Sequence, residues 1–195
     1  MGLLRTDSSG ARSRRGERAV DLRLRALQPG DRSPIATLLR SAGVFREDEV
    51  AVALELVDAA LERPDHPDYR FAVAAVGDEV AGYACWGPTP CTLGTFDLYW
   101  IAASPAHQGR GVGRLLLSHA EADMAARGAR LCVIETSSLP RYAPARDFYL
   151  RMGYREEARL REFYAPGDDK VVFVRHLAGP GDAEASPLPG TPGGR

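Results

Sequence analysis

A glycine-rich segment between a predicted strand and a predicted helix is the part of the sequence best suited to chemistry. It reads Gln-Gly-Arg-Gly-Val-Gly-Arg over residues 108–114. Glycines at the start of a helix let the backbone approach a ligand closely, and the unpaired amides of the first turn attract anions. Arg110 and Arg114 add cationic donors. The pattern therefore predicts a binding site for a pyrophosphate group.

Two common phosphate-binding motifs do not fit this segment. The Rossmann fingerprint G-x-G-x-x-G needs a glycine where the sequence has Arg114, and it should follow the first strand of a fold instead of the fourth. A P-loop needs Gly-Lys followed by Ser or Thr, whereas the one lysine of the chain is Lys170. The segment is therefore expected to be a phosphate site of another kind.

A second motif lies downstream and reads Ala-Arg-Asp-Phe-Tyr-Leu-Arg-Met-Gly-Tyr over residues 145–154. It resembles the pattern A-x-x-F-Y-x-x-x-G-[FY] of the GNAT acetyltransferase superfamily. The first motif, Gln-x-x-Gly-x-Gly after a strand, resembles the acetyl-CoA signature of the same superfamily. The order of the predicted strands and helices is also similar to that of the family, so the resemblance extends over nearly all of residues 20–176. It implies an N-acetyltransferase that takes acetyl-CoA as co-substrate and moves the acetyl group directly to a primary amine.

The resemblance also implies a cofactor site. In the family, the fourth and fifth strands splay apart, and the pantetheine arm lies in the gap against the backbone of the fourth strand. The residues carried over for the arm are Ile101, Ala102 and Ala103. The residues carried over for the pyrophosphate are Gln108, Gly109, Arg110, Gly111, Val112, Gly113 and Arg114. Many members also have an Asn where this chain has Tyr142, so that contact falls to Ser137, Ser138 or a water.

Amide formation needs an amine that loses a proton and a thiolate that gains one. Tyr149 falls on the family position of the acid. For the base, Asp97 falls on the family position of the glutamate used by the histone-modifying branch. Glu135 is a second candidate for the base. The third alternative is a chain of water molecules with no dedicated base. By strand alternation, Asp97 shares a face with Tyr99 and Ile101, and it lies roughly 13 Å from Ile101 along the strand.

A mixed α/β sheet is predicted to position these residues. Alternating and β-prone runs predict strands near residues 20–27, 69–76, 79–87, 95–103, 131–135, 154–164 and 170–175. A period near 3.6 predicts helices near 31–42, 47–62, 109–127 and 144–151. Asp31 is the expected N-cap of the first helix, and Gly128 the expected end of the third. The expected fold class is α/β, with a mostly antiparallel GNAT-type sheet splayed between strands four and five and helices on both faces.

Composition excludes several classes of protein. The chain has 195 residues, of which 25 are Lys or Arg and 26 are Asp or Glu, so a formal net charge of −1 gives no reason to expect nucleic acid. No apolar run reaches the ~18 residues of a membrane span, and the first residues have no apolar signal region. Cys85, Cys91 and Cys132 are odd in number, and neither they nor the four histidines show metal-ligand spacing. We therefore expect no metal and a cytoplasmic location.

The predicted domain covers residues 19–177. Residues 1–18 are basic and residues 178–195 are rich in Gly and Pro, so both are predicted to be disordered tails. No motif identifies the acceptor, which is expected to be a small-molecule amine or, as an alternative, a protein amine. A homodimer and a non-catalytic acyl-CoA sensor both remain open. The acidic segment 46–68 is expected near the acceptor, where it either attracts a cationic amine or forms a solvated helix face.

Overall fold

The structure is a computed structural model that describes residues 21–64, 66 and 68–177. The two predicted tails lie outside the described residues. In chain order the strands and helices are β1 (Leu22–Arg25), α1 (Arg32–Ala42), α2 (Glu47–Glu62), β2 (Arg70–Val76), β3 (Glu79–Pro88), β4 (Thr95–Ala103), α3 (Val112–Ala126), β5 (Leu131–Ser137), α4 (Ala143–Arg151), β6 (Arg155–Ala165) and β7 (Asp168–His176). This succession is the one predicted from the sequence.

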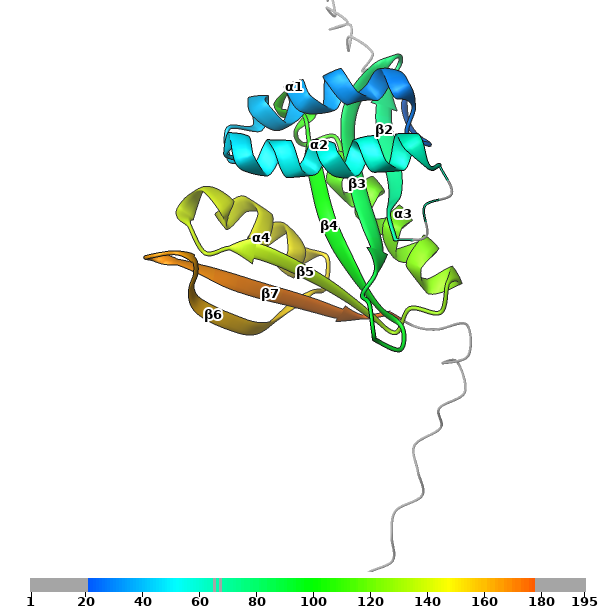
Figure 1. Ribbon diagram of the computed structural model, residues 1–195. Helices are drawn as coiled ribbons and strands as arrows, with labels where there is room; N and C mark the ends of the chain where they lie inside the picture. Colours follow the sequence, from blue (N-terminus) through cyan, green and yellow to red (C-terminus); the bar gives the residue numbers. More distant parts are fainter. Residues whose placement is uncertain (1–20, 65, 67, 178–195) are drawn as a thin grey trace, which may run out of the picture.

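One seven-stranded sheet runs through the described part of the chain in the order β1-β2-β3-β4-β5-β7-β6 (Figure 1). Neighbouring strands are antiparallel except β4 and β5, which are parallel. The chain passes from β5 through α4 to the edge strand β6, and the final hairpin then inserts β7 between β5 and β6. The predicted mixed α/β fold with a mostly antiparallel sheet is confirmed.

β4 and β5 pair only over their first residues. Residues 95–98 pair with residues 131–134, and the pairing stops there although both strands continue. At the same point, the single step from Cys85 to Trp86 in β3 spans two residues of β4, which leaves Tyr99 as a bulged residue. A bulge bends its strand and increases the local twist. β4 therefore turns away from β5 beyond the bulge, and the predicted splay is confirmed.

The bulge also changes which face of the sheet each residue of β4 occupies. Before the bulge, Phe96 and Leu98 pack in the core beneath α3. After it, Ile101 packs against that core while Trp100 packs beneath α1 and α2. Asp97, which alternates with Phe96 and Leu98, therefore lies on the opposite face from Ile101. The prediction that these two residues share a face is wrong, because simple alternation cannot count an extra residue.

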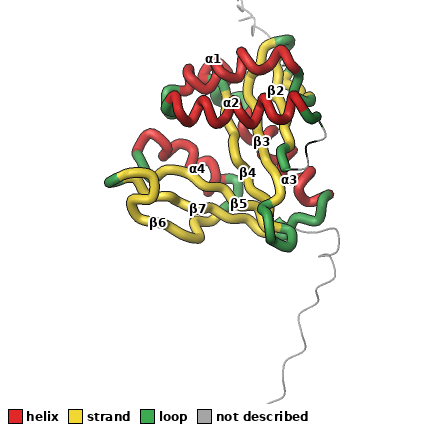
Figure 2. The backbone as a smooth tube through the Cα atoms, in the orientation of Figure 1, coloured by secondary structure: helices red, strands yellow, loops and turns green. Residues whose placement is uncertain are grey.

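Helices cover both faces of the sheet, as Figure 2 shows. α1 and α2 pack on one face through buried side chains that include Ile35, Leu39, Val50 and Val57. α3 packs on the other face through Leu116, Leu117, Ala120 and Met124. α4 contributes Tyr149 to this second core. The predicted coverage of both faces is confirmed. The gap between β4 and β5 therefore lies between the layer of α1 and α2 and the layer of α3 and α4.

The start of α3 differs from the sequence prediction. The helix begins at Val112, whereas the glycine-rich segment was expected to be helical from Gly109. Gly109 and Gly111 have φ angles of +75° and +80°, which no right-handed helix accommodates. The segment is therefore a loop that ends at the helix. At the other end, Gly128 has a φ of +82° and stops the helix as predicted.

The start of α1 also differs in its capping. Asp31 occupies the predicted N-cap position, but its side chain makes no capping hydrogen bond to α1. Instead its carboxylate accepts two hydrogen bonds from Arg25, at 2.6 and 2.7 Å, and one from the Gln28 amide at 2.8 Å. Asp31 therefore ties β1 to the turn before α1, because a buried carboxylate takes the nearest cation in preference to a helix amide.

Gly82 of β3 permits close packing between α3 and the splayed end of β4. A Cβ atom at Gly82 would lie 2.6 Å from Cγ1 of Val112 and 2.8 Å from the carbonyl oxygen of Ala102. Val112 is the first residue of α3, and Ala102 lies in the part of β4 that β5 does not pair with. Gly82 therefore sets the distance between these two elements.

We expect Gly82→Ala to lower the free energy of unfolding by about 1–3 kcal/mol, because the added methyl group overpacks a buried contact with a backbone oxygen. Urea denaturation measures this change. Gly30→Ala is the matched control, since a Cβ there meets no atom within 4 Å. A Gly82→Ala variant as stable as the Gly30→Ala variant would contradict the close packing described above.

Candidate active site

A cavity of about 750 Å³ opens where β4 and β5 separate. Its walls come from the ends of both strands, from the α1–α2 connection, from the start of α4 and from the β6–β7 hairpin; they include Phe45, Arg46, Asp48, Glu49, Tyr99, Trp100, Ile101, Ala102, Ala103, Gln108, Glu135, Thr136, Ser137, Arg141, Tyr142, Tyr149, Tyr164 and Asp168. The cavity is therefore a direct consequence of the splay. Beyond residue 98 the edge of β4 has no strand partner, so its backbone can pair with an extended ligand.

The structure brings several predicted cofactor residues to this cavity. Ile101, Ala102 and Ala103 form part of its wall at the unpaired end of β4. Gln108 also lines it and connects the cavity to the glycine-rich loop. An elongated ligand lying along β4 would therefore reach the start of α3.

The glycine-rich loop presents a row of unpaired amides. The first helical hydrogen bond of α3 runs from the Leu115 amide to the Gly111 carbonyl at 2.9 Å. The amides of residues 111–114 precede it and have no acceptor within the helix. A Cβ at Gly109 or Gly111 would meet no atom within 4 Å, so the surface of the loop is open. Open amides at the positive end of a 15-residue helix are what an anion site requires.

Two arginines border the loop. Arg110 and Arg114 are both exposed. Arg110 Nη1 lies 3.5 Å from Nδ1 of His107. Neither arginine takes part in an ion pair with another described residue, so both guanidinium groups are available to a phosphate.

Tyr149 of α4 is buried and lines the cavity. Its ring packs among Phe148, Tyr154 and Phe173, with centroid distances of 5.6, 6.2 and 5.7 Å. Burial raises the pKa of the Tyr149 phenol above its ordinary value, and the neighbouring Cys132 adds to the rise. Tyr149 is therefore a protonated phenol at neutral pH, in a fixed position, which suits a proton donor.

Asp97 and Glu135 lie on neighbouring strands, but only Glu135 is part of the cavity wall. Burial raises the pKa of the Asp97 carboxyl above its ordinary value. The Thr89 hydroxyl donates to Asp97 Oδ2 at 2.7 Å and lowers this pKa, whereas the negative charge of Glu135 raises it further. Glu135 Oε1 lies 2.7 Å from Nζ of Lys170. The charge of Glu135 therefore acts on Asp97, while Glu135 itself is paired with Lys170.

Tyr142, at the family position of the asparagine, is buried and joins two parts of the cavity wall. Its hydroxyl lies 3.0 Å from the Val44 carbonyl oxygen and 3.3 Å from Glu49 Oε1, so its one proton is shared between these two acceptors. Its ring also packs edge-on against Phe45. Tyr142 therefore fixes the α1–α2 connection over the cavity.

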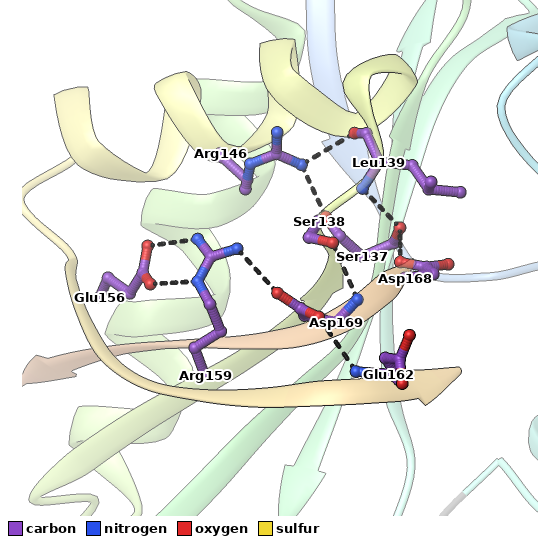
Figure 3. A network of polar contacts seen from close by, with 9 residues as sticks. All are labelled: Ser137, Ser138, Leu139, Arg146, Glu156, Arg159, Glu162, Asp168 and Asp169. Atoms are coloured by element: carbon purple, nitrogen blue, oxygen red, sulfur yellow. Dashed lines mark hydrogen bonds and ion pairs between the residues drawn. The ribbon is translucent and has the colours of Figure 1, made fainter. Parts of the chain in front are cut away.

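The end of β5 contains polar residues whose arrangement the sequence did not reveal. Figure 3 shows Arg146 of α4 donating to the carbonyl oxygens of Ser137 and Leu139, at 2.6 and 3.0 Å. The Ser137 hydroxyl donates to Asp168 Oδ1 at 2.5 Å and accepts from the Leu139 amide at 3.0 Å. Asp168 belongs to no motif and reaches the site from the last hairpin. Only the register of β7 beside β5 could have identified it.

Four acids in the described part of the acidic segment pair with arginines, namely Glu47, Asp48, Glu49 and Asp58. Glu47 pairs with Arg40, Asp58 with Arg32 and Asp48 with Arg46, at 3.1, 2.6 and 3.0 Å. Asp65, which belongs to the segment, lies outside the described residues. Internal pairing reduces the field with which the paired acids could attract a cationic amine.

Within the described ranges, no group of three or more His, Cys, Asp or Glu side chains is arranged to hold a metal ion. Cys85, Cys91 and Cys132 are all free thiols. No described helix combines the length and apolarity needed to cross a membrane.

The family model for the acetyltransferase (GNAT) domain matches residues 67–156, which include the glycine-rich loop and Tyr149. A solved structure of a GNAT-family protein from Desulfovibrio desulfuricans is 43% identical to this chain; the match covers 80% of this chain and 99% of the other, with a TM-score of 0.78. The chain belongs to the GNAT family of acetyltransferases. A comparison with curated proteins gives no match.

More distant solved structures share the GNAT fold. The ribosomal-protein-S18-alanine N-acetyltransferase from Escherichia coli is 20% identical, with 83% of this chain and 97% of the other covered and a TM-score of 0.64. The YncA protein from Salmonella typhimurium, solved with its cofactor acetyl-CoA, is also 20% identical, with coverages of 85% and 99% and a TM-score of 0.65. At this level of identity the likeness concerns the fold alone.

Proposed function

We propose that this GNAT protein transfers an acetyl group from acetyl-CoA directly to a primary amine. The observation that carries the proposal is one cavity that runs from the unpaired edge of β4 to Tyr149, with the amide-rich loop next to Gln108. Acetyl-CoA matches this arrangement, because its thioester and its pyrophosphate lie at opposite ends of a long arm. The acetyl-CoA complex of YncA supports the choice of co-substrate.

The chain would hold the two ends of acetyl-CoA differently. Backbone groups of Ile101, Ala102 and Ala103 would pair with the amides of the pantetheine arm, in the manner of an added strand. Gln108 and the loop amides of residues 109–114 would hold the pyrophosphate, with Arg110 and Arg114 as cationic partners. The loop would therefore supply most of the affinity for acetyl-CoA, and β4 would set the position of the thioester.

The chemistry requires one proton to leave the amine and one to reach the sulfur. The amine nitrogen attacks the thioester carbonyl carbon, the new C–N bond forms, and the C–S bond breaks as the oxygen recovers its double bond. Tyr149 would donate its phenolic proton to the departing sulfur, so that the products are an acetamide and a free thiol. Positioning of the two reactants supplies much of the remaining acceleration.

We propose Glu135 as the group that takes the proton of the amine. Its location in the cavity wall favours this role over Asp97, which lies outside the wall. Asp97 would then act through its charge and through water, at a distance from the reacting atoms. A path of water molecules alone is the remaining alternative.

The acceptor is proposed to be a small molecule. A cavity of about 750 Å³ has the size of a small-molecule site, and part of it must hold the arm of acetyl-CoA. A protein amine, presented on a narrow side chain or terminus, is the alternative. The free thiols of Cys85, Cys91 and Cys132 support a reducing, cytoplasmic location.

Gly111→Glu tests the proposed pyrophosphate site. Acetyl-CoA should raise the melting temperature of the wild type by mass action, and Gly111→Glu should abolish this shift by placing a negative side chain among the loop amides. Gly128→Glu is the matched control, because its φ of +82° and its open surroundings equal those of Gly111 at the other end of α3. Loss of the shift in both variants, or in neither, would refute the assignment.

Tyr149→Phe tests the proposed acid. Turnover should fall roughly 10²–10⁴-fold, the usual effect of removing one positioned acid, while the dissociation constant of acetyl-CoA stays unchanged. Release of free thiol measures the rate. Tyr154→Phe removes a neighbouring buried hydroxyl, which donates to Glu121, and should leave the rate within about threefold of the wild type. Equal rates in the two variants would show that Tyr149 only packs.

A pair of variants distinguishes the two candidate bases. Because an ammonium acceptor must lose a proton before attack, removing the base should reduce turnover most at low pH. Glu135→Gln should therefore show a loss of kcat/KM that shrinks as the pH approaches the pKa of the amine. Asp97→Asn should show a smaller and flatter loss over the same range. The opposite pair of profiles would assign the base to Asp97.

A further inference from the structure

Two carboxylates in the described part of the chain are equally buried but differently partnered. Asp31 and Asp168 are each only 4% exposed. Asp31 accepts two hydrogen bonds from Arg25 and a third from a backbone amide. Asp168 forms no ion pair with another described residue, and its side-chain partner is the Ser137 hydroxyl, at 2.5 Å from Oδ1. Asp168 therefore lacks the cationic partner that Asp31 has. Burying a carboxylate without a cation is costly.

The position of the Asp168 carboxylate is fixed by its surroundings. The Ser137 oxygen already accepts from the Leu139 amide, so its single proton is directed at Asp168. Arg146 in turn holds the carbonyl oxygens of Ser137 and Leu139. Figure 3 shows one oxygen of Asp168 facing Ser137 and the other pointing away from this network. Since Asp168 lines the cavity, the second oxygen is available to a ligand.

The other charged groups of the cavity wall have partners or face solvent. Glu135 pairs with Lys170 at 2.7 Å. Asp48 and Glu49, on α2, pair with Arg46 at 3.0 and 3.8 Å. Arg141 is exposed, so water screens its charge. Asp168 is therefore the buried carboxylate of this wall that has no cation among the described residues.

We propose that Asp168 binds a positively charged nitrogen of the acceptor. This inference rests on the proposed acetyl transfer at the same cavity, and it specifies the substrate class as amines that are cationic when bound. The ammonium group supplies the missing partner of the carboxylate and makes a charge-assisted hydrogen bond to the free oxygen. Alcohols and neutral amides of the same shape leave Asp168 unpaired and are rejected for that reason.

Calorimetric titration of the full chain with 1,4-diaminobutane tests the proposal. The wild type should bind the diamine at one saturable site and should not bind 1,4-butanediol, its neutral isostere. Asp168→Asn should weaken the dissociation constant of the diamine about 10- to 100-fold, the usual value of a charge-assisted hydrogen bond. Asp48→Asn removes a charge from the same wall that Arg46 already compensates, and should change the constant less than about twofold.

An unchanged dissociation constant in Asp168→Asn, or no binding of the diamine to the wild type, would overturn the proposal. A crystal structure of the wild type with 1,4-diaminobutane gives a reading that needs no variant to fold. A nitrogen within hydrogen-bond distance of Asp168 supports the proposal, and a diamine bound elsewhere overturns it.

Acetyl transfer is scored separately by amine-dependent release of free thiol. Diamine binding at Asp168 without any thiol release would refute the proposed function and leave the ammonium site standing. Thiol release by the wild type, together with an unchanged diamine affinity in Asp168→Asn, would refute the ammonium site alone.

Discussion

The pairing of β4 with β5 stops after four residue pairs, although both strands continue. The bulge at Tyr99 bends β4 at this point, while β5 keeps its full register with β7 to Ser137. An unpaired strand edge inside a protein is costly unless something satisfies its backbone groups. In this fold the edge borders a cavity, so a ligand or water can satisfy it. The end of the β4–β5 pairing therefore both opens the cavity and leaves backbone groups free to bind a ligand.

The cavity joins two ends of opposite electrostatic character. At the start of α3, open amides and the exposed Arg110 and Arg114 favour anions. At the end of β5, the buried Asp168 favours a cation. Tyr149, which also lines the cavity, is held in its protonated form by burial. The proposed reaction would join an anionic acyl carrier to a cationic amine, and this polarity would favour entry of each reactant from its own end.

The sequence was informative where local chemistry decides the structure. The β-prone run of residues 95–103 and the helical spacing of apolar residues in 47–62 predicted a strand and a helix, which the structure contains as β4 and α2. The two motifs likewise located the glycine-rich loop and Tyr149, because each depends on residues close together in the chain. Those predictions needed no knowledge of the sheet register.

The sequence was uninformative where distant segments meet. Tyr99 looks like any other strand residue, and its bulge arises only from the register of β4 against β3. For that reason the shared face of Asp97 and Ile101 was predicted wrongly. Asp168 follows an ordinary Pro-Gly turn, and it reaches the cavity only because β7 inserts between β5 and β6. Such features depend on the whole sheet, which no local pattern encodes.

Hydrogen exchange of the backbone amides, measured with and without acetyl-CoA, tests the central claim most directly. If the ligand adds to the unpaired edge of β4, exchange should slow at residues 99–103 and 109–114 and stay unchanged in the β1–β2 pair. A complex that forms while exchange at residues 99–103 is unaffected would contradict the account, because the splay would then not be the binding site.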